Sequence, residues 1–228
     1  DTKEGAKEFD DLLFKHIGHA TKNAFGAFGA ALTGSKFVSA SMSGETKEYY
    51  QHMTRLSRAL AISADVAMLT LGGELKRKEM ISARLGDGLS YLFMGSAVLK
   101  KYEDDGRQQS DLDYVHYAMN HCLHHAAQSL QEAYSNFPSK VASKFLNFLV
   151  FPLGNRFKKA SDDNAVAIAN SLMTPGAHRD RLTHLCYVGK DNDDPVGLME
   201  NAFMAMYKVR GHERKVIQGI REGKIDKK

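Results

Sequence analysis

Residues Glu74 to Arg107 read ELKRKEMISARLGDGLSYLFMGSAVLKKYEDDGR. Between Gly88 and Leu99 this run has no charged residue and is apolar or small on every side of a helical wheel. A helix that is apolar all round is normally enclosed by neighbouring elements, because a face in contact with water would be polar. The run is shorter than the roughly 20 apolar residues that span a bilayer, and Ser and Gly interrupt it. It therefore predicts the central helix of a soluble bundle.

Three further long helices are predicted around this run. Apolar residues recur at helical spacing from about Lys7 to Leu32, and again after Ser43, which can cap a helix that Gly72-Gly73 ends. Another long helix begins near Ser110 and ends at Pro138. Four long helices with short connections predict an all-α fold, an antiparallel bundle over residues 1–137.

The rest of the chain, residues 138–228, predicts shorter helices and a basic tail. The expected helices are Ser139–Val150, Asp162–Met173, Arg179–Tyr187 and one that starts near Pro195, a residue favoured in the first turn. No long flexible linker separates them from the bundle. We therefore expect these residues to pack on the bundle as one unit.

Composition narrows the class of protein. The chain has 228 residues, 43% of them hydrophobic, which is enough for one large domain or two small ones. A net charge of +4 is too mild to indicate a nucleic-acid partner. Cys122 and Cys186 both lie in apolar helical patterns, which favours buried free thiols and a reducing compartment. We see no signal peptide or transmembrane segment, and a start at Asp1 without Met indicates a piece of a longer polypeptide.

One pair of opposite charges stands at the edge of the apolar run. Arg84 and Asp87 are three residues apart, a spacing that brings two side chains together on a helix. A charge beside an apolar helix centre needs a partner. The pair is therefore interpreted as a structural ion pair in the bundle, with contact to another domain as the alternative.

A basic segment follows the fourth long helix. Between Ser139 and Lys159 there are five positive residues and no acidic one, together with a group of large apolar residues. These are Lys140, Lys144, Arg156, Lys158 and Lys159, and Phe145, Phe148, Leu149, Val150 and Phe151. Basic segments with bulky apolar residues can lie in an anionic membrane surface. An ordinary buried helix with solvated lysines remains the alternative.

Four histidines cluster in the fourth long helix, and two of them could share a metal. His121 and His125 are four residues apart, but zinc needs further ligands that the sequence does not identify. We interpret them, with His116 and His124, as packed or surface histidines. The chain also lacks a P-loop, a GxGxxG after a strand, a nucleophile elbow and a CxxC pair. Motifs alone therefore indicate a helical domain without an active site of its own and assign no catalytic, cofactor-binding or metal residue.

An ordered set of short motifs resembles a known family. It comprises Ala83-Arg84-Leu85-Gly86-Asp87, Ser96-Ala97-Val98-Leu99-Lys100, Tyr102-Glu103-Asp104-Asp105-Gly106-Arg107, Asn136-Phe137-Pro138, Phe151-Pro152-Leu153-Gly154 and Arg179-Asp180-Arg181-Leu182-Thr183. Their order and spacing resemble the C-terminal region of the large bacterial acyl-CoA dehydrogenases of fatty-acid β-oxidation. Gly88 and Ala160 depart from the pattern, where a large aliphatic residue and Pro would be expected.

The resemblance implies a flavoenzyme in the full polypeptide. Such an enzyme oxidises a fatty acyl-CoA to the trans-2-enoyl-CoA, with a glutamate base, FAD as hydride acceptor and an electron-transfer partner that reoxidises the flavin. The base and the flavin site belong to an upstream core, and no glutamate here matches the motif of the base. Resemblance also implies a homo-oligomer in the cytoplasm, with peripheral association at the inner membrane through the basic segment.

Two functions follow as expectations. In the first, this chain is the accessory C-terminal domain, which packs on the flavin-binding core, shapes assembly and contacts the membrane. In the second, it is a stand-alone helical module that binds a partner helix or a lipid surface and has no catalytic core.

Overall fold

The computed structural model describes residues 3–189 and 194–226, and every element in these ranges is a helix or a connection. The predicted all-α class is therefore confirmed. Contacts divide the chain into two compact units, Asp1–Asp162 and Asp163–Lys228, which are described separately.

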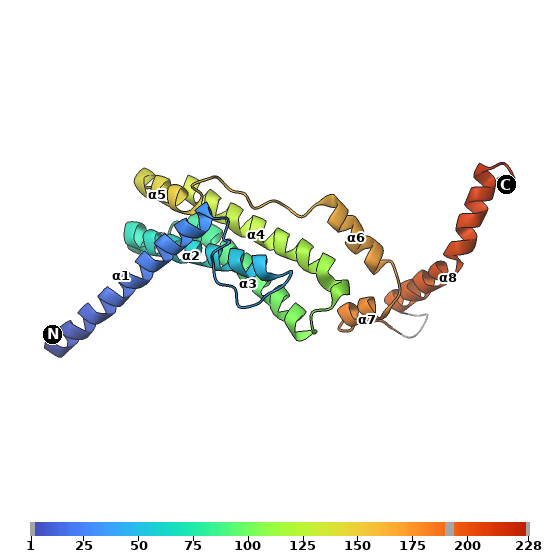
Figure 1. Cartoon of the computed structure of the whole chain (residues 1–228), viewed down its shortest axis with the longest axis horizontal. Helices are drawn as coiled ribbons and strands as arrows, with labels where there is room; N and C mark the ends of the chain where they lie inside the picture. The colour runs from blue at the N-terminus through green and yellow to red at the C-terminus, as the bar shows by residue number, and fades with distance from the viewer. Residues whose placement is uncertain (1–2, 190–193, 227–228) are drawn as a thin grey trace. The chain divides into compact units, whose positions relative to one another are not determined.

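The first unit consists of four long helices and a short one (Figure 1). These are α1 (Lys3–Leu32), α2 (Lys47–Leu71), α3 (Glu79–Asp104), α4 (Leu112–Ser135) and α5 (Lys140–Val150), with 3-10 turns at Gly72–Lys76 and Gln109–Asp111. Helices α1 to α4 pack against one another, most extensively α3 against α4, and α5 packs on α1, α2 and α4. The predicted bundle of four long helices is thus present.

The core of this unit lies between α2, α3 and α4 and is closed by α5. Leu56, Met119 and Leu130 are fully buried there, as is the pair Ser63 and Tyr134. The two hydroxyl oxygens of that pair are 2.6 Å apart, and the Ser63 hydroxyl also lies 2.5 Å from the carbonyl oxygen of Ala59. Both hydroxyl groups are therefore satisfied away from water, as buried polar groups must be.

Glycines set how closely α3 and α4 approach. A Cβ added at Gly95 would lie 3.1 Å from the Met53 sulfur and 3.4 Å from the Met119 methyl group. One at Gly88 would meet Leu130 at 3.7 Å. The lack of side chains at these two positions lets the helices pack tightly.

One predicted helix start is wrong. Helix α2 begins at Lys47, and Thr46 precedes it without a side-chain cap, so Ser43 is not the cap. Gly44 has a φ of 90°, a left-handed conformation that cannot belong to a helical turn. The chain therefore becomes helical only after this glycine.

The centre of α3 is only half enclosed, which corrects the expectation from its apolar sequence. Gly88, Leu92, Gly95 and Leu99 are buried against neighbouring helices. On the other side Leu89 is 59% exposed, Phe93 72% and Met94 44%. The sequence shows that a helix surface is apolar but not which element covers it, and none of the described residues of this unit covers that side.

The stretch Lys47–Lys76 is long and apolar enough to cross a membrane by length and composition alone, although no transmembrane segment was expected. Core helices of soluble proteins meet the same criterion. Here α2 packs on α1, α3, α4 and α5 and buries Arg55 and Gln51, which suits a core helix.

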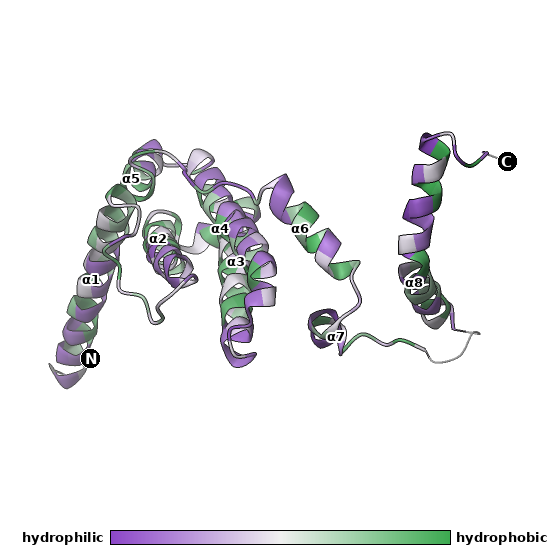
Figure 2. Cartoon of the chain, turned by 45° about the vertical axis from the view of Figure 1, so that its right-hand side comes forward, coloured by the Kyte–Doolittle hydropathy of each residue, from purple (hydrophilic) through white to green (hydrophobic). Residues whose placement is uncertain are grey.

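The second unit contains α6 (Asp162–Leu172), α7 (Ala177–Thr183) and α8 (Pro195–Arg221). Hydrophobic residues are interspersed with hydrophilic ones along α6 and α8 (Figure 2). In these three helices the only buried residue is Gly197. Pro195 occupies the first turn of α8 as predicted, and the Asp194 carboxylate accepts a hydrogen bond from the Gly197 amide at 2.7 Å.

The predicted boundary at 137–138 differs from the observed division at 162–163. Helix α5, grouped by sequence with the shorter helices, packs on the long ones and belongs to the first unit. Packing of the later helices on the bundle stays a prediction. Lys227 and Lys228 of the basic tail lie outside the described residues.

Candidate functional site

The uncovered side of α3 is a candidate interaction surface. Its exposed residues recur every three or four positions and are small or apolar, and they are Ala83, Gly86, Leu89, Ser90, Phe93, Met94 and Ala97. We call this set the outer face of α3. Large apolar side chains flanked by small ones let another backbone approach closely, which suits contact with a protein surface.

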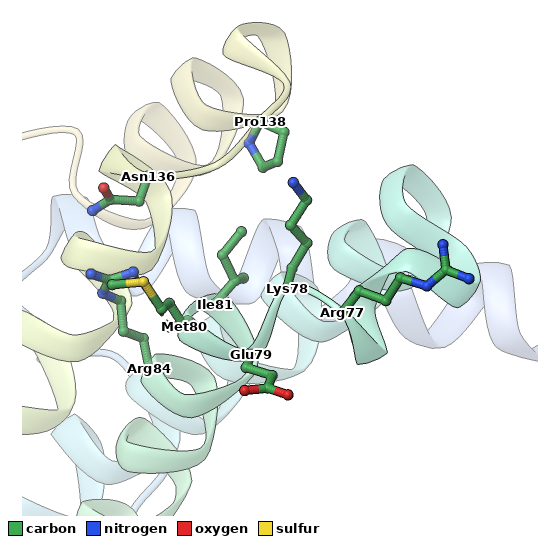
Figure 3. Close-up of a pocket in the computed structure, with 8 residues that line it drawn as sticks. All are labelled: Arg77, Lys78, Glu79, Met80, Ile81, Arg84, Asn136 and Pro138. Carbon is green, nitrogen blue, oxygen red and sulfur yellow. Dashed lines mark hydrogen bonds between the residues drawn. The ribbon is translucent and has the colours of Figure 1, made fainter.

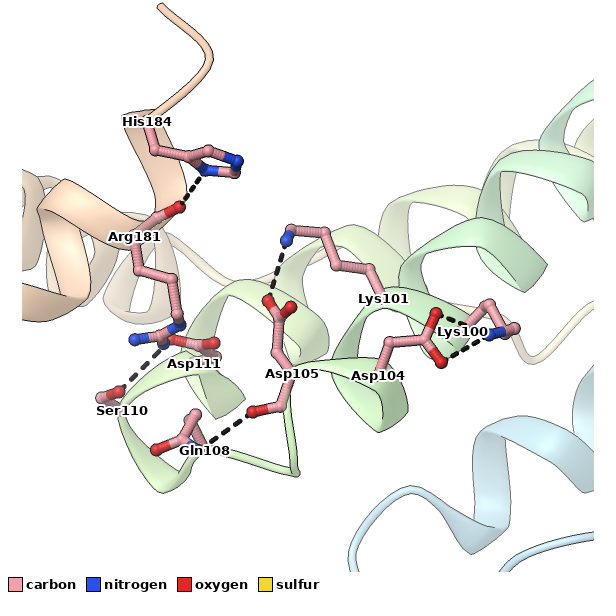
Figure 4. A network of polar contacts seen from close by, with 9 residues as sticks. All are labelled: Lys100, Lys101, Asp104, Asp105, Gln108, Ser110, Asp111, Arg181 and His184. Carbon is pink, nitrogen blue, oxygen red and sulfur yellow. Dashed lines mark hydrogen bonds and ion pairs between the residues drawn. The ribbon is translucent and has the colours of Figure 1, made fainter.

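Charged side chains bound the outer face at the C-terminal end of α3 (Figure 4). Lys100 pairs with Asp104, and Lys101 pairs with Asp105 at 2.8 Å. The Gln108 side chain donates to the backbone carbonyl of Asp105 at 2.9 Å. Exposed pairs of this kind contribute little stability. Their effect here is to mark where the apolar surface ends.

At the other end of α3, Arg84 does not form the predicted pair with Asp87. Its Nε lies 3.8 Å from Oε2 of Glu132 on α4, and its Nη1 donates to the Met80 carbonyl at 3.4 Å. Asp87 is exposed beside the outer face. Arg84 is thus an inter-helix contact within the first unit, while a contact between Asp87 and another domain stays a prediction.

Arg84 also lines a pocket of about 410 Å³ at the start of α3 (Figure 3). The lining residues are Arg77, Lys78, Glu79, Met80, Ile81, Arg84, Asn136 and Pro138. Arg77 donates to Glu74 at 3.0 Å, and Arg84 has Glu132. Two of the four charged residues in the lining, Arg77 and Arg84, are therefore already in ion pairs.

The predicted basic segment is divided between two places. On α5 the residues Lys140, Lys144, Phe145 and Phe148 are exposed, and the phenylalanines are 47% and 64% exposed. Leu149 and Phe151 are buried in the core, as are Leu146 and Val150. One side of α5 is therefore part of the core, and the other is an exposed apolar strip with lysines beside it. Contact of this strip with a membrane stays a prediction.

The remaining cations of that segment, Arg156, Lys158 and Lys159, lie in the connection after α5 and are exposed. They help to line a second pocket, of about 270 Å³, which we call the α2–α4 pocket. Its lining residues are Glu48, Tyr49, His52, Asn120, Leu123, Arg156, Phe157, Lys158 and Lys159. All of them belong to the first unit.

The connection is held in place by the fourth helix and by its own side chains. His124 Nδ1 lies 2.8 Å from the Phe157 carbonyl oxygen, and the Phe157 amide donates to the Asn155 side chain at 3.0 Å. The guanidinium of Arg55 lies 5.0 Å from the centre of the Phe157 ring, and His52 meets that ring edge-on at 5.2 Å. Phe157 is therefore the shared wall between the pocket and the buried Arg55.

The histidines serve packing in this structure. The rings of His121 and His125 are 4.4 Å apart, and Tyr91 stacks on His125 at 5.1 Å. His116 Nδ1 lies 2.7 Å from the Tyr49 hydroxyl. Burial and the nearby cationic groups lower the pKa of His125, which favours its neutral form. Among the described residues, no group of three or more metal-ligating side chains is present.

The prediction that both cysteines are buried is right for one of them and wrong for the other. Both are free: Cys122 is buried, as predicted, but Cys186 is exposed. Burial raises the pKa of the Cys122 thiol, so it stays protonated and acts as a small apolar residue.

Comparison with known proteins decides the family. The family model for the C-terminal domain of acyl-CoA dehydrogenases, bacterial type, matches residues 1–228. The chain belongs to this family. No solved structure matches it. The resemblance expected from motifs such as Ala83–Asp87 and Arg179–Thr183 is thereby confirmed, and the chain is the C-terminal domain of a bacterial-type acyl-CoA dehydrogenase.

Sequence reasoning missed two features of this acyl-CoA dehydrogenase domain. It did not single out the α2–α4 pocket, and it did not notice Arg55. The sequence does contain a sign of the buried Arg55. It stands at helical spacing between Gln51 and Ala59, on the stripe of α2 residues that faces the core. A charge in such a stripe indicates a special environment.

Proposed function

We propose that this chain is the accessory domain of an FAD-dependent acyl-CoA dehydrogenase and docks on the flavin-binding core of the same polypeptide through the outer face of α3. The observation that carries this proposal is the exposure of Phe93 and Leu89, 72% and 59%, on a helix whose sequence is that of an enclosed one.

The energy available from this face is large enough for docking. Complete burial of a Leu or Phe side chain contributes about 1.5–3 kcal/mol. Because Leu89 and Phe93 are 59% and 72% exposed, covering what is still exposed would contribute about 2–4 kcal/mol before ordering costs. Gly86, Ser90 and Ala97 let the partner backbone come close, and the ion pairs of Lys100 and Lys101 set the edge of the contact.

Catalysis is assigned to the core, not to this domain. The reaction that we propose for the parent polypeptide is oxidation of a fatty acyl-CoA to the trans-2-enoyl-CoA with FAD and an electron-transfer partner, and membership of an acyl-CoA dehydrogenase family supports it. The described pocket at the start of α3 is lined mostly by charged or polar side chains and has no aromatic residue to stack on a flavin ring, so this lining does not suit a flavin. We therefore assign these residues a role in assembly rather than a chemical step.

The docking proposal is tested with charges placed on the outer face. The variant Leu89→Asp/Phe93→Asp should leave the helical content of the 228-residue chain unchanged, because both side chains are exposed. In the full enzyme the same variant should lower thermal stability and FAD retention. Leu69→Asp, at an 87% exposed position on α2, is the matched control. A full enzyme unaffected by the double variant would contradict the proposal.

Membrane association is a second candidate, favoured by the exposed strip of α5. Val141, Phe145 and Phe148 lie on one side of this helix and are 80%, 47% and 64% exposed, with Lys140 and Lys144 beside them. Apolar side chains flanked by lysines suit an anionic lipid surface. Lys140→Glu/Lys144→Glu should abolish flotation with phosphatidylglycerol vesicles. If the variant floats as well as the unchanged chain, α5 does not bind the membrane through these lysines.

A further inference from the structure

The α2–α4 pocket carries an excess of positive charge. Arg156, Lys158 and Lys159 line it, and none of the three forms an ion pair with any residue that the structure describes. One acidic residue also lines it: Glu48, whose carboxylate accepts a hydrogen bond from His52 Nε2 at 3.2 Å. Burial lowers the pKa of His52, so it is neutral near pH 7 and adds no charge. Three cations therefore face one carboxylate.

Behind the pocket wall lies a buried guanidinium without a counter-ion. Arg55 is 5% exposed and donates one hydrogen bond, from Nη2 to the Val150 carbonyl at 3.1 Å. Its Nε is buried and has no hydrogen-bond partner. No carboxylate among the described residues forms an ion pair with it. A buried charge that lacks a partner is costly, and a natural structure usually supplies one.

The electrostatic situation of Arg55 agrees with this geometry. Burial and the nearby charge of Arg156 lower the pKa of Arg55 to about 10, so it remains positively charged at neutral pH. An anion between Arg55 and Arg156 would relieve that repulsion and neutralise both. Phe157, which lies between the guanidinium and the pocket, is held by His124 and Asn155 and fixes the spacing.

We propose that the α2–α4 pocket binds a phosphate group, with Arg156, Lys158 and Lys159 contacting its oxygens and buried Arg55 supplying charge from behind Phe157. A phosphate carries up to two negative charges and several acceptor oxygens, which matches several convergent cations better than a single carboxylate does. The pocket volume of about 270 Å³ leaves room for a diphosphate. This proposal is independent of docking by the outer face of α3.

The test uses inorganic pyrophosphate as the probe and the 228-residue chain labelled with ¹⁵N, at low ionic strength. Addition of pyrophosphate should produce saturable shifts of the Phe157 and Lys158 amides and of the His52 ring. The affinity for pyrophosphate should fall with added salt, because exposed cations form part of the site. Absence of saturable shifts, or shifts centred elsewhere on the chain, would overturn the proposal.

Two matched lysine pairs from the same basic segment make the test specific. Lys158→Ala/Lys159→Ala should weaken pyrophosphate binding about tenfold. Lys140→Ala/Lys144→Ala removes the same charge from α5 and should leave binding unchanged. Equal weakening by both pairs would show general charge attraction and would overturn the site. Arg55→Met should also weaken binding, and circular dichroism checks whether this variant is folded. If it is not folded, the two lysine pairs alone test the proposal.

The phosphate could come from a soluble molecule or from a lipid headgroup, and a vesicle arm separates them. If pyrophosphate displaces the chain from phosphatidylglycerol vesicles and Lys158→Ala/Lys159→Ala does not float, the pocket takes a lipid phosphate. If vesicles bind the variant and the unchanged chain equally while pyrophosphate binding differs between them, the pocket takes a soluble phosphate. Both results support the pocket as a phosphate site.

Discussion

Helices α4 and α8 are alike in length but differ in what surrounds them. Helix α4, Leu112–Ser135, has ten buried residues, whereas α8, Pro195–Arg221, has one, Gly197. Both have apolar residues at helical spacing, yet in α8 side chains such as Met199 and Met206 are 73% and 56% exposed. Amphipathic sequence is thus common to both helices. The contacts that α8 makes in its unit are local, such as those of Arg179 with Glu200 and Phe203, whereas neighbours in its own unit bury one side of α4. Helical stability in proteins comes mostly from such packing.

The first test of this comparison is hydrogen exchange on the chain alone. Amides in the core of α4 should exchange only through global unfolding, with an opening free energy of about 5 kcal/mol or more. Those of α8 should exchange with an opening free energy near zero, because few apolar contacts protect them. Mass spectrometry of peptides from the two helices measures the difference. Equal protection would mean that α8 is covered after all.

A matched pair of leucines tests the comparison at single residues. Leu130→Ala removes a fully buried side chain and should cost about 3 kcal/mol of unfolding free energy. Leu198→Ala, at a 52% exposed position of α8, should change it by no more than about 0.5 kcal/mol. Urea denaturation followed by circular dichroism gives both values. A Leu198→Ala loss near that of Leu130→Ala would break the comparison.

Two glycines extend the comparison of covered and uncovered surfaces to the two sides of α3. Gly86→Ala should stabilise the chain by about 1 kcal/mol, because nothing lies within 4 Å of the added Cβ and Ala favours helix. Gly95→Ala should lose about 1 kcal/mol instead, because its Cβ would crowd Met53 and Met119. Thermal melts of both variants show the signs, and stabilisation by both would contradict the tight packing at Gly95.

The smallest expected effect is a dependence of stability on pH through His52. Burial lowers its pKa in the folded chain below the ordinary value near 6.5. The unfolded chain then binds the proton more tightly, so the stability from neutral His52 is present above pH 6.5 and is lost as pH falls through that value. Urea midpoints at pH 7.5 and 5.5 should drop less for His52→Gln than for the unchanged chain. An equal drop would assign the effect to other groups.

How much the sequence predicts differs between elements and contacts. Hydrophobic residues at helical spacing, together with the Gly and Pro residues that end helices, identify the helices. Pro195 marks the start of α8 because its fixed φ suits the first turn. The start of α2 was predicted too early. Ser43 and Glu45 resemble a helix cap, and the sequence does not reveal that Gly44 between them takes a left-handed φ. Local rules thus predict elements well and their ends less well.

Contacts between distant residues were the part that could not be predicted. Arg84 has a candidate partner three residues away in Asp87, but its actual partner is Glu132, which only the packing of α3 on α4 brings near. The prediction that α3 is enclosed on every side failed for the same reason, because an apolar pattern does not say which element packs against it. The basic segment was recognised as a charge pattern, yet Lys140 and Lys159 proved to belong to different surfaces.

The short connection between α3 and α4 has a consequence for the order of folding. After α3 ends, Gly106 and Arg107 both take a left-handed φ, 79° and 55°, and Glu103 holds the Arg107 guanidinium at 2.6 and 3.0 Å. Closing so short a loop costs little chain entropy, and the two helices it joins share the most extensive contact in the chain. We therefore expect this hairpin to form first, as the nucleus on which α2, α5 and the C-terminal half of α1 later condense.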